Sequence, residues 1–127
     1  MTADISGLEA LAADLARAAA EIDSRCRQVV SRGALNIKND WRANARSTAG
    51  RHARLYPLSI GYDLTTVPGA GSSALIGPDK AGPQGALGNL LEYGSVHNPP
   101  HNDGGRALLA EEPRFIAAVD QLGRDLL

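Results

Sequence analysis

The distribution of glycine and proline constrains the fold of this 127-residue chain most strongly. Residues 1–56 contain three glycines and no proline, residues 57–105 contain ten glycines and six prolines, and the last 22 residues contain one of each. Proline interrupts helices and glycine favours turns, so the chain is expected to be helical, then turn-rich, then helical. This order predicts an α+β fold with long N-terminal helices, a small antiparallel β-sheet and a C-terminal helix packed on the sheet.

Residues 1–48 have the apolar spacing of an amphipathic helix. Intervals of three and four residues place the apolar side chains on one helical face. Gly33 falls on that face, and although glycine lowers helix propensity by about 1 kcal/mol relative to alanine, its position predicts close packing against another backbone. The stripe begins with Leu8, Leu11 and Leu15 and continues, on a second helix or past a bend, through Ile22, Cys26, Val29, Val30, Gly33, Ile37 and Trp41.

Residues 55–78 are expected to form a β-hairpin. Leu58, Ile60, Tyr62 and Leu64 alternate with more polar or smaller residues, as in a strand buried on one face. The Pro68–Gly71 stretch has the composition of a turn.

Helical segments are expected again after the hairpin. Residues 86–94 predict a short helix, and residues 106–127 predict a C-terminal helical segment. Pro113 is expected to begin the last helix, because proline is favoured at the first helical position. A length of 127 residues suits a single domain that spans residues 1–127.

The chain has little material for a hydrophobic core. Its hydrophobic fraction of 43% includes 21 alanines, and only five residues are aromatic. Aromatic side chains contribute the largest buried areas in cores. The composition therefore predicts a fold that is completed by contacts with partner subunits.

Charge is segregated along the sequence although the net charge is only −1. Residues 25–54 carry eight basic residues and one acidic residue, whereas both ends of the chain are acidic. Three interpretations stay open: contact with nucleic acid phosphates, contact with acidic segments of the same or a neighbouring subunit, or a solvated helix face. The candidate residues for a subunit interface or a channel surface are Arg25, Arg32, Lys38, Arg42, Arg46, Arg51 and Arg54.

No catalytic or metal site is predicted. His97 and His101 are four residues apart, but Pro99 and Pro100 lie between them, so they cannot form a helical ligand pair. Ser95, His97 and Asp103 contain the residue types of a catalytic triad, but a triad is defined by geometry. We therefore expect no enzymatic activity and no cofactor.

Membrane insertion and secretion are not expected either. No stretch approaches the ~20 consecutive apolar residues that span a bilayer. The N-terminus lacks the basic and apolar regions of a signal peptide, and the single Cys26 cannot form an internal disulfide. These features predict a protein made in the cytoplasm.

The order of several short motifs resembles the tail-completion, or head-to-tail joining, proteins of long-tailed bacteriophages. In that family a helix ends in a Glu-aromatic-Gly-Thr/Ser motif, followed by a Pro-rich loop and a final helix. Glu92-Tyr93-Gly94-Ser95 matches this motif, and Ile76-Gly77-Pro78 matches the strand end that precedes it. The resemblance extends over nearly the whole chain.

This resemblance implies a structural virion protein of the head–tail connector or tail terminus. It implies a homo-oligomeric ring, expected to be hexameric, that contacts neighbouring connector and tail proteins and lets DNA pass. Glu92 and Tyr93 then become candidates for an inter-subunit anchor, while a simple capped helix end stays an alternative. The competing hypothesis is a DNA-binding regulator that uses the basic segment 25–54.

Overall fold

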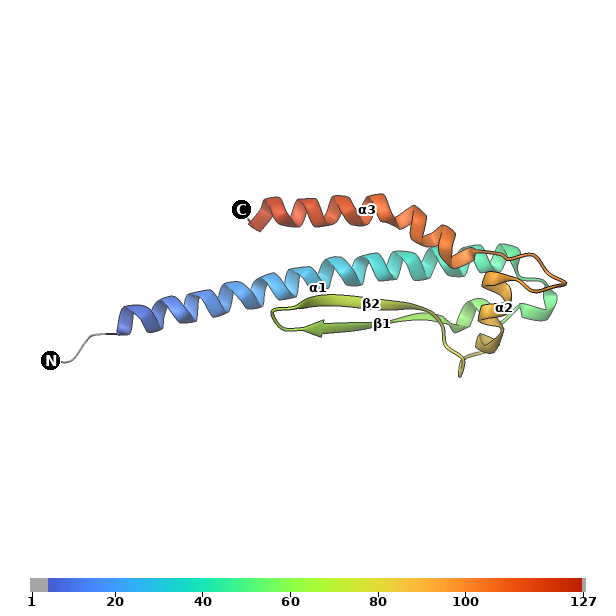
Figure 1. Ribbon diagram of the computed structural model, residues 1–127, viewed down its shortest axis with the longest axis horizontal. Coiled ribbons are helices and arrows are strands. Elements are labelled where there is room, and N and C mark those ends of the chain that lie inside the picture. The colour runs from blue at the N-terminus through green and yellow to red at the C-terminus, as the bar shows by residue number, and fades with distance from the viewer. Residues whose placement is uncertain (1–4, 127) are drawn as a thin grey trace.

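The computed structural model describes residues 5–126 and has the predicted α+β architecture (Figure 1). The elements follow in the order α1 (Ser6–Thr48), β1 (Ile60–Val67), β2 (Gly71–Pro78), α2 (Gly88–Tyr93) and α3 (Asp103–Leu126). The hairpin and α3 both run back along α1, which forms the long axis of the molecule. Residues of α1, α3 and β2 line a common cleft of about 530 Å³.

The N-terminal part of the chain forms one helix rather than two. α1 runs without interruption for 43 residues. It contains no proline, and it is rich in alanine, leucine and arginine, which favour helices. The helix ends where Ala49 becomes extended, and its N–H bonds to the carbonyl oxygen of Ala45 at 2.8 Å.

The β-hairpin lies along the second half of α1. The first strand begins at Ile60 and not near Leu55, because Tyr56–Ser59 forms a short 3₁₀ helix that buries Tyr56, so Leu58 is not part of the strand. The two strands pair in an antiparallel register that places Tyr62 opposite Ile76. The hairpin tip is fixed to α1 by polar contacts: the Gly69 N–H donates to the Asp23 carboxylate at 3.1 Å, and Arg27 Nη1 donates to Thr66 Oγ1 at 2.7 Å. A two-stranded sheet is only marginally stable by itself, and these contacts hold it against the helix.

The C-terminal helix differs from the prediction at its start. α3 begins at Asp103, so Gly104 and Gly105 are helical, and Pro113 lies inside the helix instead of beginning it. Proline removes the hydrogen bond to the carbonyl four residues earlier. That residue, Leu109, is 67% exposed, so water can take the place of the missing N–H donor. Figure 1 shows that α3 bends in its first half.

The core lies where the last turns of α1 meet the start of the hairpin. Ala45, Ala53, Tyr56 and Ile60 are buried there, and Trp41, Ala49, Leu87 and Leu91 pack around them. A second contact joins α1 to α3 at Gly33, where an added Cβ would lie 3.0 Å from the Phe115 ring. The predicted close approach at Gly33 is therefore to an aromatic side chain and not to a backbone.

Candidate functional site

Several of the basic residues predicted as interface candidates are engaged within the chain. Arg25 forms an ion pair with Asp125 at 3.3 Å, and the Lys38 amine lies 5.8 Å from the centre of the Tyr62 ring. Arg42 Nε donates to the carbonyl oxygen of Ile60 at 2.8 Å. These three residues attach α3 and the hairpin to α1, so their charge serves the fold.

Three other arginines gather at one end of the molecule. Arg46 lies in the last turn of α1, and the chain then turns at Gly50 so that Arg51 and Arg54 come beside it. Together with Ala49, Gly50 and Pro57 they line a cleft of about 290 Å³. All three are exposed, and within residues 5–126 none forms an ion pair. We call this group, Arg46, Arg51 and Arg54, the basic end.

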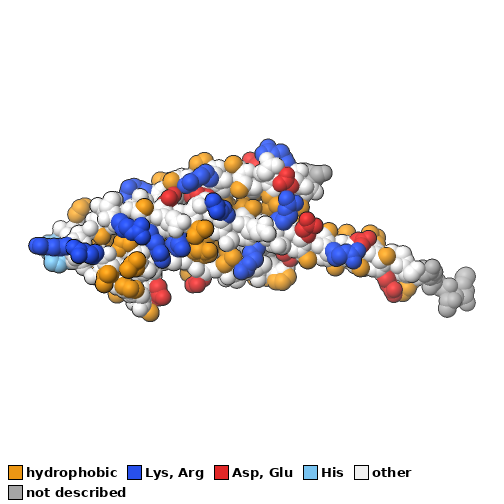
Figure 2. All heavy atoms as spheres, turned by 180° about the vertical axis from the view of Figure 1, so that it is seen from behind, with side chains coloured by type: hydrophobic (Ala, Val, Ile, Leu, Met, Phe, Trp, Pro, Cys, Tyr) orange, Lys and Arg blue, Asp and Glu red, His pale blue; other side chains and the backbone are white. Residues whose placement is uncertain are grey.

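The basic end is visible on the molecular surface. Figure 2 shows Lys and Arg side chains gathered at the end of the molecule opposite the projecting helix, with hydrophobic side chains beside them. Leu55 and Leu58, which are 50% and 53% exposed, follow the basic end in sequence. Arg32 is exposed too, but it lies in the middle of α1, away from this group.

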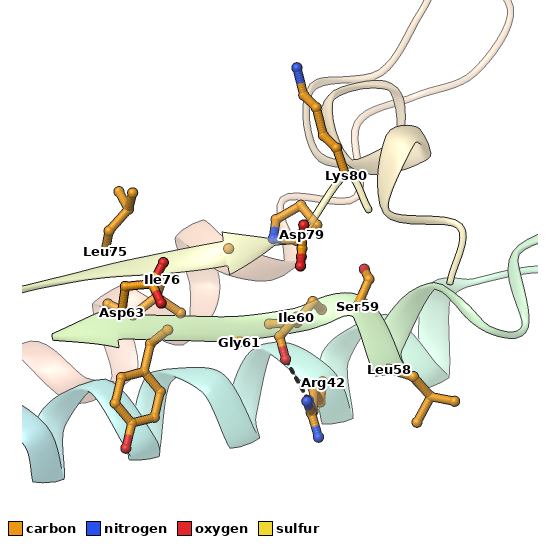
Figure 3. A pocket seen from close by; sticks show the side chains of 13 residues that line it. Arg42, Leu58, Ser59, Ile60, Gly61, Asp63, Leu75, Ile76, Asp79 and Lys80 are labelled. Carbon is orange, nitrogen blue, oxygen red and sulfur yellow. Dashed lines mark hydrogen bonds between the residues drawn. The ribbon is translucent and has the colours of Figure 1, made fainter. Parts of the chain in front are cut away.

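A larger cleft of about 750 Å³ lies beside the base of the hairpin. It is lined by Arg42 and by residues 58–63 and 75–80. Figure 3 shows that its charged side chains do not converge: Arg42 is hydrogen-bonded to Ile60 beneath β1, while Lys80 points away above β2. The cleft therefore offers no focused binding group for a small ligand.

Glu92 of the predicted motif faces inward and caps α3. It is 9% exposed, and its carboxylate accepts hydrogen bonds from the Gly104 N–H at 3.1 Å and from the Gly105 N–H at 3.0 Å. The first N–H groups of a helix have no partner within the helix, and a carboxylate there also interacts favourably with the helix dipole. Glu92 therefore holds the end of α2 against the start of α3.

The rest of the motif forms a turn with one exposed aromatic ring. Gly94 has a φ of +79°, and a Cβ on it would lie 2.8 Å from the Asn98 carbonyl oxygen, so glycine is required there. Ser95 Oγ accepts the His97 N–H at 3.3 Å within the following loop. Tyr93 is 76% exposed, which leaves its ring available to a neighbouring molecule.

The histidines and acids of the following loop do not assemble into a ligand set. Asp103 is 1% exposed, and its carboxylate accepts hydrogen bonds from Thr48 Oγ1 at 2.9 Å and from Arg106 Nη2 at 2.8 Å. His101 Nδ1 lies 3.8 Å from the same carboxylate. In the described part of the chain, no three His, Cys, Asp or Glu side chains are placed to hold a metal ion.

Burial also shifts the pKa of Tyr56, which lies in the core between α1 and the hairpin. Tyr56 is 1% exposed, and its burial raises the pKa of the phenol from 10.0 to about 12. Trp41 lowers this pKa, while the nearby carboxylates of Glu92 and Asp103 raise it further. The phenol is therefore held neutral as part of the fold.

The other end of the molecule is a helix that projects without cover. Residues 6–22, which we call the arm, extend beyond both the hairpin tip and the end of α3 (Figure 1). The arm has three acidic residues and one arginine, Arg17, which pairs with Asp14. Its apolar stripe is exposed: Leu8 is 67%, Leu11 54%, Leu15 61% and Ile22 40% exposed.

The arm was not among the site residues predicted from the sequence. Its leucine stripe has the spacing of any core-facing helix, so periodicity alone cannot show that the stripe is uncovered. The sequence feature that points to the arm is the shortage of large apolar residues elsewhere in the chain. A long apolar stripe needs a partner of similar apolar area, and the rest of the chain has too few such residues to cover it.

Comparisons with models of protein families, with curated proteins and with solved structures return no match. The resemblance to phage tail-completion proteins therefore rests on the order of the sequence motifs. Within residues 5–126, none of the helices has the length and apolar character needed to cross a membrane.

Proposed function

We propose that this protein is a structural subunit of a homo-oligomeric ring. The observation that carries the proposal is the arm, which presents four large apolar side chains between 40% and 67% exposed on a helix without tertiary cover. Contiguous exposed apolar surface of this kind marks a contact with another molecule. A helix of this length without packing partners is marginal in water, so an assembly contact supplies stability that the monomer lacks.

The distribution of charge supports a head-to-tail contact between copies. The acidic arm and the basic end lie at opposite ends of α1 and carry charges of opposite sign, so each complements the other better than itself. Contacts between two different surfaces produce a closed ring when the rotation between neighbours closes. The proposed ring is hexameric, as the resemblance implies.

The place of the ring is the head–tail connector or tail terminus of a bacteriophage virion. The support for this part is the order of the sequence motifs, in which Ile76-Gly77-Pro78 precedes Glu92-Tyr93-Gly94-Ser95, a loop and a final helix. In this role the protein joins neighbouring connector and tail proteins, and it does not catalyse a reaction. Exposed Tyr93 belongs to the surface available for those neighbours.

The oligomeric state of the purified protein tests this proposal. Light scattering after size-exclusion chromatography, together with electron microscopy of negatively stained particles, is expected to show closed rings of defined mass. Incubation with purified phage tail tubes or connector rings is expected to show binding at one end. A strictly monomeric protein that binds neither tails nor connectors contradicts the proposal.

The alternative function is DNA binding through the basic segment 25–54. The observation that favours it is the basic end, whose three arginines have no acidic partner within residues 5–126. Such binding would weaken steeply with salt, because it depends on release of counterions from the phosphates. A gel-shift titration of duplex DNA at low and at physiological salt measures it, and an absence of binding at low salt removes this alternative.

A further inference from the structure

We infer that the arm of one copy binds the basic end of the next copy. This inference rests on the proposed ring and names the two surfaces that join its subunits. The apolar part of the contact comes from the leucine stripe of the arm and, on the other copy, from Ala49 and Pro57 of the cleft and the neighbouring exposed Leu55. The polar part pairs the acidic residues of the arm with Arg46, Arg51 and Arg54.

The arm has the features of a helix that docks on an apolar and basic surface. Leu8, Leu11 and Leu15 repeat at intervals of three and four residues and therefore form one continuous face. Glu9 follows Leu8 and Glu21 precedes Ile22 in sequence, so each carboxylate lies about 100° around the helix from its apolar neighbour, and within residues 5–126 neither forms an ion pair, whereas Asp14 pairs with Arg17. A partner with apolar contacts in the middle and arginines at the margin complements this pattern.

The basic end offers that combination. Its three arginines line a cleft of about 290 Å³ together with Ala49 and Pro57, and the half-exposed Leu55 directly follows Arg54. Arginine is well suited to this position, because its guanidinium can bind a carboxylate through two parallel hydrogen bonds. Within residues 5–126 none of these three guanidinium groups forms an ion pair, so they are available to carboxylates of another molecule.

The occupant of the basic end must be a second molecule. Leu15 and Arg46 lie on the same uninterrupted helix, and 31 residues at 1.5 Å each separate them by about 47 Å. The arm therefore cannot fold back onto its own basic end.

Two other partners for the arm fit less well. Pairing of two arms side by side would bring together helices of the same net negative charge. The apolar cleft between α3 and β2 is lined by Glu111, which is paired with Arg114, and by the exposed Glu112, so it offers the carboxylates of the arm no free positive charge. The basic end, in contrast, carries three arginines whose charge is opposite to that of the arm.

A charge-swap series in the full-length protein tests this contact. The arm variant Glu9→Lys/Glu21→Lys and the end variant Arg51→Glu/Arg54→Glu each bring like charges together, and we expect roughly tenfold or greater weakening of self-association for each. The variant that carries all four substitutions restores opposite charges and is expected to assemble again. Sedimentation velocity over a concentration series at low salt measures all three, and circular dichroism confirms that each is folded.

Matched controls separate the contact from a general effect of charge. Glu112→Lys/Asp120→Lys and Lys80→Glu/Arg124→Glu make the same charge changes outside the two surfaces and are expected to leave assembly unchanged. Rings that persist in the arm and end variants would overturn this inference while leaving the proposed ring intact. A wild-type protein that stays monomeric would instead overturn the ring itself. Failure of the fourfold variant to reassemble, with its fold intact, would also contradict the pairing.

Discussion

At the scale of single residues, Glu92 is the side chain that joins two elements. Its carboxylate accepts the Gly104 and Gly105 N–H groups at the start of α3. The substitution Glu92→Gln removes the charge and one acceptor oxygen, and we expect it to lower the free energy of unfolding by about 1–2 kcal/mol. Urea denaturation measures the change. The exposed Glu112→Gln serves as the control, and equal effects of the two substitutions would contradict the capping role.

Tyr56 makes the stability of the fold depend on alkaline pH. Because the folded pKa of about 12 lies above the ordinary value of 10.0, the neutral phenol stabilises the fold fully below pH 10. Between pH 10 and about 12 this contribution is lost, and the free energy of unfolding falls by up to about 1.4 kcal/mol per pH unit. Urea unfolding at stepped pH is expected to show this slope in the wild-type protein. The same slope in Tyr56→Phe would contradict the assignment.

The start of α3 shows which local features sequence analysis cannot supply. Asp103, Gly104 and Gly105 look like a loop, because each glycine disfavours a helix by about 1 kcal/mol. The helix forms there because Glu92 caps it from another element and because Trp41 lies so close to Gly104 that a Cβ would come within 2.7 Å of the ring. Both causes are contacts between residues distant in sequence.

At the scale of elements, the periodic segments were the predictable part of the fold. Alternation over Ile60, Tyr62 and Leu64 located the hairpin, and the three-and-four spacing located α1, because both patterns reflect which side faces a partner. The spacing could not tell which partner that is. The second half of α1 packs against the hairpin and α3, whereas the arm, with the same spacing, has an exposed stripe.

This difference along α1 predicts uneven protection of its amides. In unassembled protein, amides of residues 6–22 are expected to exchange with deuterium at least about tenfold faster than those of residues 29–45, because only the latter are held by tertiary packing. In assembled protein the arm is expected to become protected. Hydrogen exchange followed by mass spectrometry at low and high protein concentration measures both states. Equal exchange of the arm in the two states would show that it is not part of the contact.

At the scale of the whole molecule, a net charge of −1 conceals two ends of opposite sign. The small net charge removes general repulsion between copies, and the separated charges favour one orientation of approach. Segregation of charge was visible in the sequence. The sequence could not show which of the arginines contact other parts of the chain. The structure shows that Arg25 pairs with Asp125 and Arg42 with the Ile60 carbonyl, whereas the arginines of the basic end form no ion pair within residues 5–126.

The same arginines cannot serve a subunit contact and DNA at once, so assembly and DNA binding are expected to exclude each other at the basic end. Leu11→Ser/Leu15→Ser removes apolar contacts of the arm without changing charge, and we expect this variant to be unassembled with its basic end free. It should then bind duplex DNA more tightly than assembled wild type.

Because three arginines are involved, the slope of log affinity against log salt concentration is expected to be about −3. Gel shifts over a salt series measure both quantities. Tighter DNA binding by the assembled ring would instead place the basic ends along an open channel, and it would contradict their burial beneath the arms.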